Sequence, residues 1–262
     1  MSKLVIVKIG GYILDNDDDL QNVIRSFVTI KEPKILVHGG GKVASETAKK
    51  FGIIPRVIQG RRITDAETLK IVQMVYAGLL NKNIVLKLQS LNCNAIGMSG
   101  VDANCILAHK REIIDIDYGY VGDIEQVNAD ILKSLLNLQL TPVLCALTHD
   151  GNTHMLNTNA DTIAAEVAGS MSIFFDVELI YCIDKEGVLR SKEKIDTVIS
   201  KITRKSYQEY IRTRIISDGM IPKLHNAFRA LDRGVKQIHI IHFNALERFN
   251  TNEMAGTTIT ER

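Results

Sequence analysis

The sequence predicts an α/β fold in which a mostly parallel sheet carries helices on both faces. Short apolar runs rich in β-branched residues recur along the chain, and stretches of helical periodicity separate them. The expected strands are residues 4–8, 35–37, 94–98, 105–108, 142–147, 173–183 and 237–241. The expected helices are residues 18–30, 41–51, 65–91, 128–138, 159–169, 204–212 and 221–233.

Local signals support individual elements. Residues 18–30 carry one apolar stripe and begin with acidic residues, which suit a helix N-terminus. Residues 65–91 predict one long helix with Thr64 as its N-cap, Glu67 as the capping-box partner and Gly78 as the place for a kink. Residues 115–123 break the alternation, and we interpret them as a β-hairpin or flap.

Composition limits the classes of function. A chain of 262 residues can bury a large core, and a formal charge of +2 indicates no special partner. Without a basic run interleaved with aromatic residues, or a long apolar run, the sequence supports neither nucleic-acid nor membrane binding. The four cysteines form no CxxC pair, which excludes the usual zinc spacings and indicates reduced thiols in the cytoplasm.

Two glycine-rich turns follow the first two strands. Lys8 precedes Gly10 and Gly11, while His38 precedes the three glycines 39–41. Ligands of parallel sheets bind beyond the carboxyl ends of the strands, and glycine backbone can approach an anion closely. This pattern predicts a phosphate site with Lys8 as a mobile charge, and we interpret His38 as a core or orienting residue. Neither a dinucleotide GxGxxG nor a Walker A motif is present.

Three further segments carry candidate polar groups. Arg61 and Arg62 precede the long helix, and one of them could hold a carboxylate, although spacing does not say which. Residues 157–161 place two asparagines and an aspartate at the start of a helix, where capping alone needs only one. Lys223 lies in the first turn of a helix, and because a cation is unfavourable there, we expect an anion close by.

In chain order, these segments resemble the amino-acid kinase family, and within it the kinases of N-acyl-glutamate. The matching segments are residues 7–11, 37–41, 60–65, 77–82, 97–102, 157–161, 184–189, 218–223 and 256–259. The resemblance implies a three-layer α/β/α sandwich with an open, mainly parallel central sheet. It also implies that ATP with Mg²⁺ phosphorylates the γ-carboxylate of N-acetyl-L-glutamate or a close N-acyl-glutamate. Residues 1–170 would form an N-terminal lobe for the acyl substrate and 171–262 a C-terminal lobe for ATP.

The resemblance also implies roles for particular residues. Lys8 and Lys223 would stabilise the transferring phosphoryl group, and Asp161 would position both lysines. The residues implied for the acyl substrate are Gly40, Gly41, Arg62 and Asn157, and those for phosphate are Gly10 and Gly11. The residues implied for the nucleotide are Asp184, Gly187 and Gly219. No protein-only metal cage is evident, so we expect Mg²⁺ to travel with the phosphates.

The resemblance leaves alternatives open. A sibling kinase could act on N-succinylglutamate or on carrier-linked aminoadipate or glutamate, and a ligand sensor could share the fold. Only three residues precede the first expected strand, without the N-terminal helix that builds the arginine-inhibited hexamer in relatives. We therefore expect an arginine-insensitive homodimer that pairs through the helix region 65–91.

Overall fold

The three-layer α/β/α architecture expected from the sequence is confirmed by the structure, a computed structural model. It describes residues 1–58, 61–190, 197–216, 220–251 and 255–261. The strands are β1 Lys3–Ile9, β2 Lys34–His38, β3 Val57–Ile58, β4 Arg61–Arg62, β5 Ala95–Met98, β6 Ile106–Lys110, β7 Gly122–Val127, β8 Thr141–Cys145, β9 Leu147–His149, β10 Met155–Asn157, β11 Asp176–Ile183, β12 Lys201–Thr203, β13 Gln237–His242 and β14 Thr257–Thr260.

Helices of three kinds connect these strands. The α-helices are α1 Gly11–Leu14, α2 Asp17–Thr29, α3 Gly41–Lys50, α4 Ala66–Gln73, α5 Asn81–Ser90, α6 Ala129–Asn137, α7 Ala160–Met171, α8 Arg204–Arg212 and α9 Ile221–Asp232. A π-helical segment, η1 Met74–Leu80, joins α4 to α5. Two 3₁₀ segments are η2 Asp102–Asn104 and η3 Phe243–Thr251. In the described part of the chain, no helix is long and apolar enough to cross a membrane.

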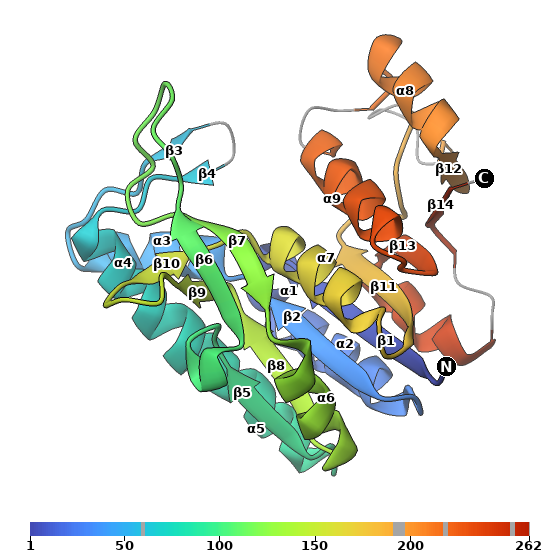
Figure 1. The fold of residues 1–262 in the computed structure, drawn as a ribbon, viewed down its shortest axis with the longest axis horizontal. Helices are drawn as coiled ribbons and strands as arrows, with labels where there is room; N and C mark the ends of the chain where they lie inside the picture. The colour runs from blue at the N-terminus through green and yellow to red at the C-terminus, as the bar shows by residue number, and fades with distance from the viewer. Residues whose placement is uncertain (59–60, 191–196, 217–219, 252–254, 262) are drawn as a thin grey trace.

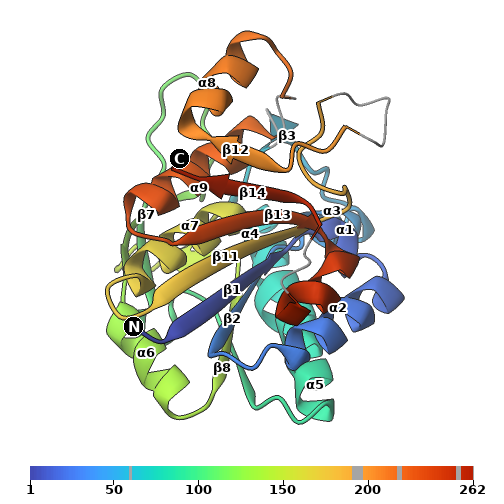
Figure 2. The same cartoon turned by 90° about the vertical axis from the view of Figure 1, so that its right-hand side faces the viewer.

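The central sheet has eight strands in the order β12-β14-β13-β11-β1-β2-β8-β5 (Figure 1). From β13 to β5 every neighbouring pair is parallel, whereas β14 runs antiparallel to β13. Figure 2 shows α6, α7 and α9 on one side of the sheet and α1, α2, α5 and η3 on the other. Because helices cover both faces, the central strands are buried throughout: six of the seven residues of β1 are buried.

A smaller sheet, β10-β9-β6-β7, lies beside the main one, and β8 leads into it through Ala146. The predicted run 142–147 is therefore two strands in two different sheets. The hairpin expected around residues 115–123 is confirmed, because β6 and β7 pair antiparallel and residues 111–121 connect them. The predicted strand 173–183 begins only at Asp176, because α7 continues to Met171 and a turn follows it.

The long helix over residues 65–91 is present, but the predicted cap was wrong. Asp65 is the N-cap, and its carboxylate accepts the N–H of Thr68 at 2.8 Å. Thr64 instead pairs through its backbone with Tyr118 and Tyr120, at 2.9 and 2.7 Å, so it remains extended. Gly78 lies inside the π-helical segment, which is the irregularity found where a kink was expected.

A polar ladder joins α7 to α9. Asn226 donates to Thr162 at 3.1 Å, and the buried Glu166 carboxylate pairs with Arg229 at 2.7 Å and with Arg233. The spacing of these contacts follows successive turns of both helices, so α9 is held in one register along α7. This register fixes the position of the first turn of α9, which is important for the site described below.

We expect Glu166→Gln to lower the free energy of unfolding by about 1–2 kcal/mol. The amide keeps the shape of the carboxylate but not its charge, while both arginines can turn toward water. Urea denaturation followed by circular dichroism measures this change. Glu67→Gln, which weakens only an exposed pair with Lys70, is the matched control and should change stability by no more than a few tenths of a kcal/mol. Equal effects of the two variants would contradict a structural role for the ladder.

Candidate active site

The candidate residues meet at the carboxyl edge of the central sheet. In the strand register Ile9 of β1 lies beside His38 of β2 and Cys182 of β11. The residues that follow these strands, including Gly10, the glycine turn 39–41 and Asp184, therefore leave the sheet at one edge. This is the edge at which ligands of parallel α/β sheets bind.

One carboxylate joins two lysines at this edge. Asp161 Oδ1 lies 2.6 Å from Lys8 Nζ, and its Oδ2 accepts a hydrogen bond from Lys223 Nζ at 2.6 Å. The Asn159 side chain caps α7 by accepting the N–H groups of Asp161 and Thr162, which fixes the first turn that carries Asp161. The anion expected near Lys223 is thus found, and it is a side chain of the protein itself.

The charges of this cluster support one another. Burial alone would raise the pKa of Asp161, but the ammonium groups of Lys223 and Lys8 hold that pKa well below its usual range. Burial also lowers the pKa of Lys223, and the like charge of Lys8 adds to the decrease, while Asp161 opposes it. The lysine side chains are only 10% and 11% exposed, so the carboxylate is the counter-charge that allows both cations to be buried here.

Tyr181 completes this cluster, although the sequence analysis did not single it out. It pairs with Lys8 across β1 and β11, and its hydroxyl donates to the Asp161 carbonyl at 3.1 Å. The Lys223 ammonium lies 4.8 Å from the centroid of its ring, a cation–π contact. Burial and nearby carboxylates raise the pKa of Tyr181 well above its usual range, so it stays neutral. In the sequence it is one aromatic residue in an apolar strand.

The two glycine turns differ in what surrounds them. A Cβ on Gly11 would meet nothing within 4 Å, and one on Gly10 would meet only Lys8 Nζ, at 3.5 Å. Gly40 has φ +154°, and a Cβ there would overlap Leu80 and lie 3.0 Å from the ring of Tyr76. Packing alone therefore requires glycine at position 40, whereas the backbone at 10 and 11 remains open to an approaching group.

The structure distinguishes the two arginines of β4. Arg61 is exposed, whereas the Arg62 guanidinium reaches back to the glycine turn, and its Nη2 donates to the Gly41 carbonyl at 2.5 Å and to Ser45 Oγ at 2.6 Å. Its Nη1 is buried without a hydrogen-bond partner among the described residues. Because a buried guanidinium nitrogen without a partner is costly, this atom is a candidate donor to an anionic ligand.

His38 is an orienting residue in the core, as its sequence context predicts. It is fully buried, and its Nδ1 lies 2.8 Å from the Gly39 carbonyl while its Nε2 accepts from the Asn81 amide at 3.1 Å. The same amide nitrogen donates to the Val143 carbonyl, which ties the long helix to β8 behind the glycine turn. Burial lowers the pKa of His38 to about 4, so the ring is neutral at pH 7.

Asn157 lies further along the site. Its amide donates to Thr64 Oγ1 at 3.0 Å, and that hydroxyl lies 3.3 Å from the Arg62 carbonyl. Asn157 is the last residue of β10 and comes four residues before Asp161. The structure thus connects the segment carrying Asp161 to the segment carrying Arg62. No direct contact between the Asp161 and Arg62 side chains is seen among the described residues.

The residues implied for the nucleotide are less closely connected. Asp184 follows β11 and is half-exposed beside Lys185, at 3.3 Å. Gly187 has φ +153°, and a Cβ there would lie 2.8 Å from Thr257 Oγ1, so packing against β14 accounts for this glycine. Gly219 lies outside the described residues. Within the described ranges no three His, Cys, Asp or Glu side chains gather in a way that could hold a metal ion.

Comparison with known proteins identifies extensive similarity. The profile of the amino acid kinase family matches residues 3–242. An acetylglutamate kinase from Cytophaga hutchinsonii is 52% identical over 261 residues, covering 99% of each chain, and one from Parabacteroides distasonis is 49% identical over 240 residues, covering 92% and 94%. The crystal structure of smu.665 from Streptococcus mutans superimposes with a TM-score of 0.81 at 28% identity, over 99% of each chain.

The neutral, buried His38 predicts a pH dependence of stability. The pKa of His38 is about 4 in the folded protein and 6.5 in the unfolded chain. Its contribution to the free energy of unfolding is therefore complete above pH 6.5 and is lost as pH falls toward 4. We expect the free energy of unfolding to fall by up to about 3 kcal/mol over this range.

Urea denaturation at pH 7.0, 5.5 and 4.5 tests this expectation with the wild-type protein and His38→Gln. The variant should be less stable at pH 7 but should lack this part of the pH slope. His109→Gln, at an exposed histidine paired with Glu125, is the control and should keep the wild-type slope. If His38→Gln also keeps the full slope, the dependence arises elsewhere.

Proposed function

Because this chain belongs to the amino acid kinase family, we propose that it is an acetylglutamate kinase. It would transfer the γ-phosphoryl group of ATP to the γ-carboxylate of N-acetyl-L-glutamate, the second step of arginine biosynthesis. The observation that carries the proposal is the cluster of Lys8, Asp161 and Lys223, in a chain half identical to enzymes of that name over its whole length.

The proposed chemistry needs positive charge more than a proton acceptor. A γ-carboxylate is already ionised at neutral pH, so one of its oxygens can attack the γ-phosphorus directly while the bond to the ADP oxygen breaks. Negative charge spreads over the transferred group during this step, and Lys8 and Lys223 would stabilise that charge. The fixed carboxylate of Asp161 would hold the two ammonium groups in position before the substrates arrive.

For the acyl substrate, we propose that Arg62 binds the α-carboxylate and Asn157 the amino-acid moiety. The buried Nη1 of Arg62 supports the first role, because it is an unused donor beside the glycine turn. The N–H groups of Gly40 and Gly41 would hold the attacking carboxylate and the phosphoryl oxygens at the start of α3, where the helix dipole favours negative charge.

For the nucleotide, we propose that Gly10 and Gly11 approach the phosphates, because their backbone is open. Asp184, Gly187 and Gly219 would line the rest of the nucleotide site, and Mg²⁺ would enter with ATP as part of the substrate. In this proposal residues 1–170 form the lobe for the acyl substrate and residues 171–262 the lobe for ATP.

The first experiment is to trap the acyl phosphate as a hydroxamate, with MgATP and N-acetylglutamate, N-succinylglutamate or free glutamate in parallel. We expect strong product formation with an acylated substrate and a fall in kcat of at least about 10²-fold in Lys8→Ala. Lys70→Ala, at an exposed lysine of α4 that pairs with Glu67, should keep the wild-type rate.

The pattern across substrates distinguishes the related functions. Product with N-succinylglutamate alone would replace the acetyl substrate by the succinyl one. The absence of product with all three compounds would contradict the proposal and would favour a carrier-linked substrate or a ligand sensor.

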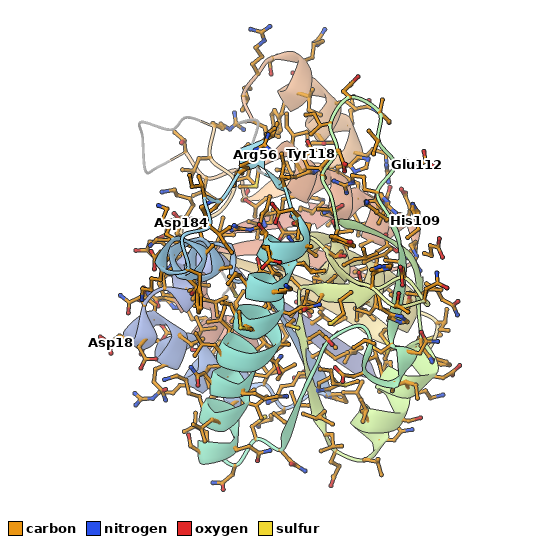
Figure 3. All side chains as sticks on the ribbon, turned by 90° about the vertical axis from the view of Figure 1, so that its left-hand side faces the viewer. Asp18, Arg56, His109, Glu112, Tyr118 and Asp184 are labelled. Atoms are coloured by element: carbon orange, nitrogen blue, oxygen red, sulfur yellow. The ribbon has the colours of Figure 1, made fainter. Side chains whose placement is uncertain are left out.

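We also propose a homodimer in the cytoplasm. The helix formed by α4, η1 and α5 runs down the face turned to the viewer in Figure 3. It leaves large apolar side chains in solvent, with Met74, Leu79 and Leu86 being 52%, 50% and 69% exposed. Such a helix face supports association with a second copy. The four free, buried cysteines support a reducing compartment.

Sedimentation velocity tests the dimer. The wild-type protein should sediment as one species of twice the 29.2 kDa chain mass, and Met74→Glu combined with Leu86→Glu should shift it to monomer. Ile173→Glu is a control, because this residue is similarly exposed but lies outside that helix. A hexamer, or a wild-type monomer at micromolar concentration, would contradict the proposal.

A further inference from the structure

The π-helical segment Met74–Leu80 directs two side chains at the glycine turn. Tyr76 and Leu80 are both buried, and both would be in the way of a Cβ on Gly40. A π-helix places its residues at angles that a regular α-helix does not, and short π segments occur frequently at functional sites. Here the segment brings the ring of Tyr76 against Gly40 and its hydroxyl within 3.8 Å of the Cβ position of Gly41.

The Tyr76 hydroxyl and the Arg62 Nη2 both lie 3.8 Å from the Cβ position of Gly41, beside the glycine turn. The hydroxyl interacts with the Arg62 guanidinium, which can only donate hydrogen bonds. A guanidinium cannot accept the phenolic proton, and no hydrogen bond from this hydroxyl to an acceptor is seen among the described residues. Burial raises the pKa of Tyr76, so the hydroxyl keeps this proton at neutral pH.

Two unused donors thus meet beside the glycine turn. One is the buried Arg62 Nη1, which has no partner among the described residues, and the other is the Tyr76 O–H, for which no acceptor is seen there. Packing does not account for the second donor, because a phenylalanine or leucine would fill the space against Gly40 without placing a polar group there. Two donors at one place suit the two oxygens of a carboxylate.

We propose that Tyr76 is a substrate-positioning residue, whose hydroxyl donates a hydrogen bond to the same substrate carboxylate that Arg62 binds. The inference rests on the proposed function, in which that carboxylate is the α-carboxylate of the acylated amino acid. Tyr76 and Arg62 would together set the distance between this carboxylate and the glycine turn, where the reacting γ-carboxylate lies.

The test is Tyr76→Phe, which removes the hydroxyl and keeps the ring against Gly40. We expect the KM for N-acetylglutamate to rise about ten-fold, because a hydrogen bond to a charged acceptor is lost. The kcat and the KM for ATP should stay within about two-fold. Calorimetric titration of the ATP-free protein with N-acetylglutamate should show the same loss of affinity. Tyr210→Phe, on α8, is the matched control and should leave all these values unchanged.

A substrate analogue tests whether Tyr76 contacts the α-carboxylate. In competition assays, 4-acetamidobutanoate keeps the acylated amine and the γ-carboxylate but lacks the α-carboxylate, so Tyr76→Phe should not weaken its binding further. An equal penalty with this analogue would overturn the assignment to the α-carboxylate. An unchanged KM for N-acetylglutamate, or parallel changes in kcat, both KM values and thermal stability, would overturn the role of Tyr76. A wild-type protein that neither binds nor phosphorylates acyl-glutamate would instead overturn the proposed function, and this inference with it.

Discussion

The Asp161 carboxylate is the interaction on which the rest of the site depends. It joins Lys8 of β1 to Lys223 of α9, two residues far apart in the chain, across the first turn of α7. Burying two ammonium groups to this degree is costly without an opposite charge, and Asp161 supplies one 2.6 Å from each of them. The α7–α9 ladder through Glu166 also helps to hold the cluster together, because it fixes the helix that carries Lys223.

A second constraint lies behind the glycine turn 39–41. His38 and Asn81 link β2, β8 and the long helix, so the turn has a rigid support on its inner side. Gly40 is required by the packing of that support, whereas Gly10 and Gly11 have open space around them. Glycines that look alike in the sequence thus serve different ends: one allows close packing of the protein with itself, and the others leave backbone accessible.

The fold could be predicted well from the sequence because its central strands are buried on both faces and therefore stand out as continuous apolar runs. The shortest strands, such as β3 and β4 with two residues each, are too short to show any periodicity. The meeting of Lys8, Asp161 and Lys223 followed from a resemblance, and the structure brings these residues together. The choice between Arg61 and Arg62 depends on the register of one strand pair, and the placement of Tyr76 against the glycine turn depends on a π-helical segment. Neither can be recognised from residue spacing.

The charges at this edge are set before any substrate binds. Lys8 and Lys223 flank the carboxylate of Asp161, and Arg62 adds a cation beside the glycine turn, while burial keeps His38 and Tyr76 neutral near pH 7. Among these groups positive charge is in excess, as the transfer of a phosphoryl group to a carboxylate would require. Because Asp161 already orders both ammonium groups, an incoming phosphate would meet donors that need little reorganisation. The Asp161 carboxylate lowers the net positive charge that a phosphate meets, but it fixes the positions of the two lysines. For a reaction that depends on alignment, these fixed positions contribute more to catalysis than the lost charge would.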